Sequence, residues 1–509
     1  MISRRTLLKE LGAGSAMLAM PAFLAACAPK HMRQDPLPTD PFGAWFGVDP
    51  LSTRLVLEEL SQHGADWAEL YFQHSRSTSL SLEDGIVSQA SSRIDQGVGL
   101  RVVVGDHTGY AFTEDLSLEA MRAAAKSAAA IAKAGPARLP TDFAHVPQPE
   151  FYSVALPWSE VGIDQRLPLL ERAAAITRAL DTSITKVSVN WSDEEQRVLI
   201  ATLEGGYHLD RRPMSRIWVN VTAVKNGVTR SNSANLAGRR GLEWYTEEKL
   251  QLLAKQAVDR TMVLFDARRP PAGELPVVLA AGASGILLHE AVGHGMEADF
   301  NRKNISIYAD MIARKVAPDF VTIVDDGTVP NERGALNVDD EGVPGQRTVL
   351  VEKGYLASYL HDRISAKHYQ MKSTGSGRRE SFRFPPMPRM RCTSMEDGPH
   401  SREEILASVK KGIIAETFTN GQVQIGAGDF TFYIKNGWMI EDGKVTYPIS
   451  DCNIIGNGPD ALRRLTMAAN DSMLDTGGWT CGKDGQSVPV SQGLPTVLVS
   501  SLTVGGQDG

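Results

Sequence analysis

The 509-residue sequence has no excess of positive charge, no fixed-period repeat and no apolar run long enough for a membrane span. A net charge of −7 gives no electrostatic footprint for nucleic acid, so we expect no nucleic-acid partner. The apolar run Leu11–Ala26 is too short and too rich in small residues to cross a bilayer. No Gly-x-Ser-x-Gly elbow of a serine hydrolase occurs. An apolar content of 42% and a charged content of 22% are those of a globular protein.

The first residues resemble an export and lipid-attachment signal. The pair Arg4-Arg5, followed by leucines, resembles a twin-arginine export signal, and Leu24-Ala25-Ala26-Cys27 resembles a lipobox. We therefore expect a signal peptide over residues 1–26, a lipid on Cys27 and a proline-rich tether over residues 27–51. The predicted location is the periplasmic or exterior face of a membrane, reached by the twin-arginine route. The alternative is a simple secretory signal with an incidental cysteine.

Cysteine is scarce, with four in the whole chain. If Cys27 carries a lipid, then Cys392, Cys452 and Cys481 remain. An odd number of thiols argues against a disulfide framework. Metal ligation is one way to protect such a thiol in an oxidising compartment.

Hydrophobic periodicity predicts an α+β protein of two or more domains. We expect helices over residues 53–63, 116–134, 163–180 and 247–264, and strands over residues 67–72, 77–82, 97–104, 186–190, 196–203 and 216–224. After Arg269-Pro270-Pro271 the composition changes to strands and turns. The predicted architecture is an N-terminal α/β region over residues 52–270, with a loop near 136–150 as a candidate internal boundary, and a β-rich C-terminal domain over residues 271–509.

The stretch His289-Glu290-Ala291-Val292-Gly293-His294 has the residue types of a zinc-dependent hydrolase. Two neutral imidazoles can hold the metal, and the carboxylate between them can accept a proton from an attacking water. The histidines stand five residues apart, whereas the common zincin motif places them four apart. Because five residues on a regular helix leave two side chains about 140° apart, we expect either a π-bulge or a bend at Gly293. The alternative is that two ordinary histidines straddle a glutamate by chance.

Several segments resemble the TldD/PmbA family, in its TldD branch. The stretch Leu287–Glu297 resembles the family's metal-binding segment. Other matching segments follow in the family's order over residues 60–509: Gly97–Arg101, Thr108–Ala111, Val324–Gly327, Asp339–Gln346, Gly377–Phe382, Pro386–Met390, Ile455–Pro459 and Cys481–Pro489.

This resemblance implies a zinc peptidase whose metallopeptidase domain covers residues 271–509. It implies that His289 and His294 are zinc ligands, that Cys481 is the third ligand and that Glu290 is the general base. One thiolate and two imidazoles leave a coordination position for water, as in catalytic zinc sites. Cys452 lies where no ligand is expected, and we interpret it as a small buried residue.

The resemblance also implies an assembly. A PmbA-like (TldE-like) subunit or a second copy of the chain would enclose a chamber in which unfolded or short peptides are cut. The alternative is a non-catalytic modulator or binding subunit of such a complex, although the complete set of histidines, glutamate and cysteine argues against it. Familiar family members are cytoplasmic, so their physiological substrates are not transferred to a chain with an export signal.

Overall fold

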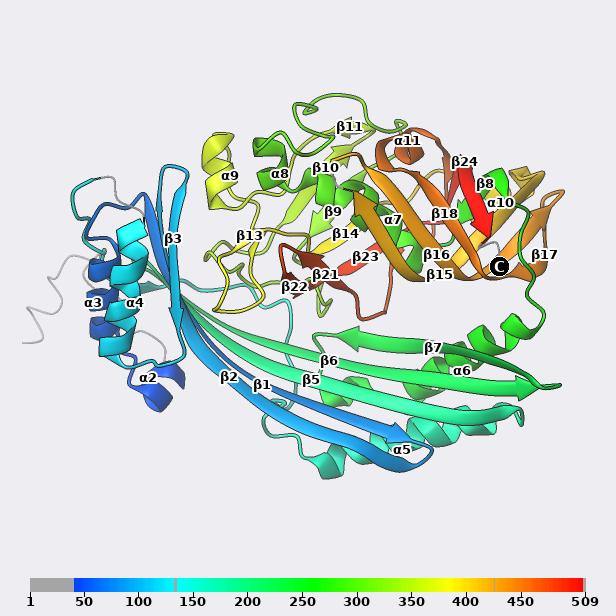
Figure 1. Cartoon of the computed structure of the whole chain (residues 1–509), viewed down its shortest axis with the longest axis horizontal. Helices are drawn as coiled ribbons and strands as arrows, with labels where there is room; N and C mark the ends of the chain where they lie inside the picture. The colour runs from blue at the N-terminus through cyan, green and yellow to red at the C-terminus, as the bar shows by residue number, and fades with distance from the viewer. Residues whose placement is uncertain (1–40, 132–134, 425, 507–509) are drawn as a thin grey trace, which may run out of the picture.

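The N-terminal half is built on one long, curved antiparallel sheet (Figure 1). This computed structural model describes residues 41–131, 135–424 and 426–506. The strand order is β3-β2-β1-β5-β6, with β7 on the other edge of β6 and a short parallel β4 (Ala144–His145) also paired with β6. The strands are β1 (Trp67–Glu83), β2 (Ile86–Val104), β3 (His107–Thr113), β5 (Ile184–Thr202), β6 (Gly206–Lys225) and β7 (Val228–Gly238).

Helices cover the outer face of this sheet at its two ends. Helices α3 (Pro50–Leu60) and α4 (Leu118–Ile131) pack at one end, and α5 (Ile163–Ala179) and α6 (Glu247–Met262) pack at the other, while the short α2 (Pro41–Phe46) precedes them. All four longer helices lie where hydrophobic periodicity predicts them, although residues 132–134 of the second predicted helix lie outside the described residues. Among the described residues, no helix combines the length and apolarity needed to cross a membrane.

The prediction of separate, paired strands over residues 67–72 and 77–82 is wrong. Both segments belong to the single strand β1, which pairs with β2 and β5 along its length. Alternate residues such as Leu70 and Leu82 pack against the helices, whereas Gln73, Ser75 and Ser77 point to the other face and line a cavity. This polar middle interrupts the hydrophobic pattern but not the strand. The strands predicted over residues 186–190 and 196–203 are likewise parts of one strand, β5, because the polar residues between them interrupt the hydrophobic pattern but not the strand.

The C-terminal half contains a closed β-barrel. Strands follow the order β15-β8-β24-β18-β16, and β16 pairs again with β15. Two further strands extend it, β17 on β16 and β19 on β24. The strands are β8 (Gly273–Leu279), β15 (Lys411–Gln424), β16 (Asp429–Glu441), β17 (Lys444–Ile449), β18 (Cys452–Asn457), β19 (Leu465–Ala468) and β24 (Val497–Gly506).

A second sheet lies beside the barrel, in the order β11-β10-β9-β14-β23-β20. Its strands are β9 (Ile323–Asp326), β10 (Arg347–Glu352), β11 (Tyr355–Leu356), β14 (Cys392–Met395), β20 (Met473–Leu474) and β23 (Ser491–Leu494). Two small ladders, β12 (Gly377–Arg378) with β13 (Met387–Pro388) and β21 (Thr480–Lys483) with β22 (Gln486–Pro489), complete the strands. Short helices α7 (Ile286–Leu288), α8 (Ala298–Arg302), α9 (Arg363–His368), α10 (Arg402–Ser408) and α11 (Gly458–Arg463) connect them.

The two halves face each other across the concave side of the N-terminal sheet. Strands β1, β2, β5 and β6 curve beneath the C-terminal half, and the β21–β22 hairpin lies on the side of that half nearest the sheet (Figure 1). The whole is an α+β protein, as the sequence predicts.

Candidate metal centre

The segment with the predicted metal ligands begins where β8 ends in the core. Gly282 has a φ of 83°, a conformation that favours glycine, and its N–H donates to the carbonyl of Leu494. A tight turn over Ala283–Gly285 leads into α7, whose three apolar side chains are buried. This burial fixes the start of the metal segment against the barrel and the second sheet.

A single π-helical turn follows, His289–Gly293, in which the N–H of His294 donates to the carbonyl of His289. The wider turn puts rings five residues apart on one side, with 4.9 Å between their centroids. Of the two expected distortions, the structure shows the widened turn. Glycine at position 293 leaves room for the buried Met390, because a Cβ there would lie 1.9 Å from its sulfur and would force that side chain to move.

The β21–β22 hairpin brings Cys481 to the two histidines. Ligand atoms of His289, His294 and Cys481 all lie within 4.8 Å of one another, and the Cys481 sulfur is 3.4 Å from Nε2 of His294. The three side chains are 3%, 4% and 2% exposed. Nδ1 of His289 is buried and has no hydrogen-bond partner among the described residues. A buried group of two imidazoles and one thiol, with an unused ring nitrogen, fits a zinc ion with one open position.

Buried charges hold His294 in place. Nδ1 of His294 lies 3.0 Å from Oε2 of Glu297, which leaves Nε2 facing the sulfur. Lys483 reaches the same carboxylate at 3.1 Å and Asp299 at 2.7 Å. Arg389 donates to the backbone carbonyl of Cys481 at 2.6 Å. A carboxylate behind a histidine fixes its tautomer and orientation, and the neighbouring cations keep that carboxylate ionised.

The ionisation of the cluster also suits metal binding. Burial raises the pKa of the Cys481 thiol, but the rings of His289 and His294 outweigh it and hold the pKa well below its ordinary value. Burial lowers the pKa of His294, yet Glu297 and Cys481 raise it well above its ordinary value. Without a metal, these shifts favour a thiolate on Cys481 beside a protonated ring on His294. A metal cation would displace that proton.

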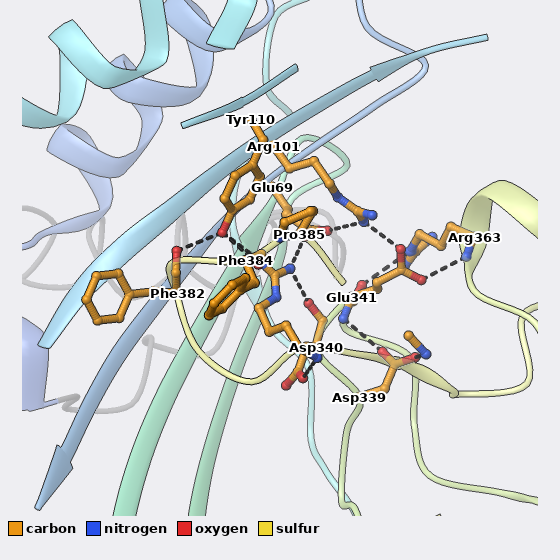
Figure 2. Close-up of polar contacts among 12 residues, drawn as sticks. Glu69, Arg101, Tyr110, Asp339, Asp340, Glu341, Arg363, Phe382, Phe384 and Pro385 are labelled. Carbon is orange, nitrogen blue, oxygen red and sulfur yellow. Dashed lines mark hydrogen bonds and ion pairs between the residues drawn. The ribbon is translucent and has the colours of Figure 1, made fainter. Parts of the chain in front are cut away.

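A second buried network joins the N-terminal sheet to the C-terminal half (Figure 2). Glu69 of β1 accepts from Arg101 of β2 at 2.9 Å and also from Arg379. Arg101 donates in addition to Glu341 at 2.5 Å. The hydroxyl of Tyr110 lies 2.7 and 2.8 Å from the carbonyl oxygens of residues 382 and 384. Several segments that carry the family resemblance therefore meet at this junction.

Three stretches of the chain match the three domains of one peptidase family. Residues 68–132 match PmbA/TldA metallopeptidase domain 1, residues 156–265 match the central domain and residues 272–506 match the C-terminal domain. The chain belongs to the TldD/PmbA metallopeptidase family. This confirms the resemblance found in the sequence.

Individual relatives agree with the TldD/PmbA assignment. The chain is 40% identical to a metalloprotease TldD homologue of Haemophilus influenzae over 466 residues, which cover 90% of this chain and 97% of that one. It is 29% identical over 344 residues to a zinc metalloprotease TldD homologue of Saccharolobus solfataricus, covering 67% and 76%. The crystal structure of TldE from Thermococcus kodakarensis has the same fold, with a TM-score of 0.70, 19% identity and coverage of 89% and 100%.

The other predicted site residues of this TldD-family metallopeptidase have distinct environments. Glu290 is half-buried, and its carboxylate makes no hydrogen bond or ion pair with any described residue. Cys452 is fully buried in the barrel core, and burial raises the pKa of its thiol to about 12. Arg4, Arg5 and Cys27 lie outside the described residues.

The supporting residues Glu297, Lys483 and Arg389 carry no predicted role in the sequence analysis. Glu297 stands three residues after His294 and Lys483 two residues after Cys481, spacings that place each on the same side of a turn or strand as the ligand. These spacings are the feature of the sequence from which Glu297 and Lys483 could have been predicted. Arg389 has no such signal, because only the folded chain brings it to Cys481.

Proposed function

We propose that the chain is a zinc-dependent peptidase in which His289, His294 and Cys481 hold the metal and Glu290 is the general base. The observation that carries the proposal is a buried ligand group in which His289 is followed directly by Glu290, whose carboxylate has no partner among the described residues. Zinc bound there would act as a Lewis acid and increase the acidity of a water molecule. Glu290 takes the proton of the attacking water and passes it to the leaving amine.

The proposed substrates are unfolded or short peptides. A cavity of about 640 Å³ lies between the concave sheet and the β21–β22 hairpin, the hairpin that also carries Cys481. A space of this size admits an extended chain more readily than a folded domain. A TldE-like partner, or a second copy of this chain, would complete the enclosure. The fold shared with TldE supports a pairing of related subunits.

Glu290→Gln tests the catalytic proposal. The variant keeps the ligands, so zinc content stays at the wild-type level, while hydrolysis of an unstructured peptide falls by about two to four orders of magnitude. Metal analysis and peptide hydrolysis are measured on the same preparations. Wild-type protein that contains zinc but cuts no peptide would instead support the non-catalytic modulator. A zinc-loaded variant with full activity would remove Glu290 from the mechanism.

We also propose that the protein is exported by the twin-arginine route and anchored by a lipid on Cys27. Arg4-Arg5 and the lipobox-like segment that ends at Cys27 support this proposal. Lysines in place of Arg4 and Arg5 should leave the protein in the cytoplasm, and Cys27→Ala should prevent membrane attachment. Wild-type protein that fractionates as soluble, with an intact N-terminus, would contradict the proposal.

A further inference from the structure

The cavity between the two halves has an unusual balance of charge. Most arginines on its wall are matched by acids: Arg212 pairs with Asp340 at 2.6 Å, and Arg383 pairs with Asp95 at 2.7 Å. The exceptions are Arg239, which follows β7, and Arg378 of β12. Neither forms an ion pair with a described residue.

Arg239 is 3% exposed, yet its Nε is buried without a hydrogen-bond partner among the described residues. Its guanidinium stacks on the ring of Tyr152, and its one hydrogen bond, to the carbonyl of Pro213, is 3.5 Å long. Burial lowers the pKa of Arg239; Tyr152 and Asp210 oppose this shift, and the neighbouring Arg212 adds to it. A buried guanidinium with so few partners lacks compensation for its lost hydration.

Arg378 is also 3% exposed and has only neutral partners, the carbonyl oxygens of Met390 and Pro489. Burial lowers its pKa to about 9; attraction by Asp340 opposes this shift, and repulsion from Arg389 and Arg239 adds to it. Arg239 and Arg378 line the same cavity and repel each other, so an anion bound in that cavity is attracted by both.

Two acids on the same cavity wall, Glu194 and Glu380, also make no ion pair with a described residue. Burial raises the pKa of Glu194, although Arg239 and Arg333 attract its charged form. The carboxylate of Glu380 accepts a hydrogen bond from the backbone N–H of Ser487. Because neither acid pairs with Arg239 or Arg378, both guanidinium groups stay available to an anion that enters the cavity.

The position of Arg378 relates this charge to the metal centre. Its partner Pro489 is the next residue after Val488, and Val488 is directly opposite Cys481 in the hairpin. An extended peptide advances about 3.3 Å per residue. A group held by Arg378 therefore lies within a few residues of a peptide bond presented to the metal.

We propose that Arg239 and Arg378 bind a carboxylate of the substrate, so that the enzyme selects peptides with an acidic group a few residues from the scissile bond. This proposal rests on the peptidase function proposed above. The carboxylate is either the C-terminus of the peptide or the side chain of an aspartate or glutamate. Both present the planar pair of oxygens that a guanidinium binds in two hydrogen bonds.

The test uses one flexible peptide in four forms: with a free or amidated C-terminus, and with glutamate or glutamine at internal positions. Binding is measured by fluorescence anisotropy on full-length, zinc-loaded Glu290→Gln protein, and cleavage is measured on the wild type. We expect the carboxylate forms to bind about ten-fold to a hundred-fold more tightly than the neutral form. Loss on amidation identifies the C-terminus, and loss on replacing glutamate identifies the side chain.

Arg239→Gln and Arg378→Gln should each reduce this preference strongly, and the double variant should bring the ratio close to one. Arg347→Gln is the matched control, because Arg347 is paired with Glu396 away from the cavity, and it should keep the wild-type ratio. If a glutamine variant does not fold, Arg239→Lys retains the charge but not the planar fork and should keep part of the preference. Equal binding of all four peptides to the folded protein would overturn the proposal. Preferential binding without cleavage by the wild type would contradict the peptidase function and leave the carboxylate site standing.

Discussion

Replacing Glu297 with glutamine tests whether the buried charges behind the metal centre matter for metal binding. The side chain is fully buried and lies 3.0 Å from Nδ1 of His294 and 3.1 Å from Nζ of Lys483. Glutamine has nearly the same volume, so packing is preserved while the negative charge is lost. An amide can still accept a hydrogen bond from His294, but it does not stabilise a positive charge on zinc or on Lys483 in the same way.

The expected cost has two parts. Loss of an oriented carboxylate behind a histidine ligand weakens zinc binding by about 10-fold to 100-fold, or about 1.4 to 2.8 kcal/mol. In the zinc-free protein, burial alone would raise the pKa of Glu297, but Lys483 and His294 lower it to about 2, compared with an ordinary value of 4.5. Since the folded pKa is depressed, the ionised group stabilises the fold above pH 4.5 by up to about 3 kcal/mol, and this stabilisation is lost as the pH falls towards 2.

Both parts can be measured on purified protein. Competition with a zinc chelator gives the affinity, and urea unfolding of the zinc-free protein between pH 2.5 and 7 gives the stability. The difference between wild type and Glu297→Gln should be largest near pH 7 and should shrink below pH 4.5. Glu352→Gln, an exposed carboxylate on β10, is the control and should change neither quantity. Wild-type zinc affinity in Glu297→Gln would refute the orienting role.

Three further predictions concern the ligands, the π-helical turn and access to the site. Cys481→Ser should remove most of the zinc, because a neutral hydroxyl is a poor substitute for a thiolate, whereas Cys452→Ser in the barrel core should change zinc content little; metal analysis giving the reverse order would reassign the third ligand. Gly293→Ala should lower zinc content and the melting temperature because its Cβ would collide with Met390, whereas Gly482→Ala, where a Cβ meets no atom within 4 Å, should be tolerated. A flexible peptide should be cut at several positions while the same sequence inside a stably folded domain survives, and rapid cleavage at a surface loop of the folded form would contradict an enclosed site.

Local signals in the sequence predict the helices and the metal segment well. The four long helices have apolar residues at helical spacing, and the five-residue separation of His289 and His294 predicts a distorted helix. The long strands are harder to predict, because Ser75 and Ser77 in β1 face a polar cavity that exists only in the folded chain. A strand that is apolar at both ends and polar in the middle has the same local pattern as two short strands.

Contacts between segments that are far apart in the chain cannot be predicted from the spacing of residues in the sequence. Cys481 stands 187 residues from His294, and its place in the site follows in the sequence only from family resemblance. Glu69 and Arg379, 310 residues apart, have no local signal for their pairing. Resemblance identifies such segments as a set, and the structure shows that several of them meet at the junction between the halves (Figure 2).

The buried arginines of this protein fall into two groups with different physical consequences. Arg101 binds the carboxylates of Glu69 and Glu341, and Arg379 of the C-terminal half binds that of Glu69 in the sheet, so both charges are compensated within the chain and fix how the sheet sits against the C-terminal half. Replacing Arg101 leaves the buried Glu341 without its ion pair, and replacing Arg379 removes one of the two guanidinium partners of Glu69, so either change should destabilise the fold. Arg239 and Arg378 have no carboxylate partner in the described chain, so their replacement removes an uncompensated charge and should leave stability unchanged or increased. If only replacement of Arg101 or Arg379 lowers the free energy of unfolding, the paired arginines stabilise the fold. Arg239 and Arg378 are then available to bind the carboxylate of a substrate.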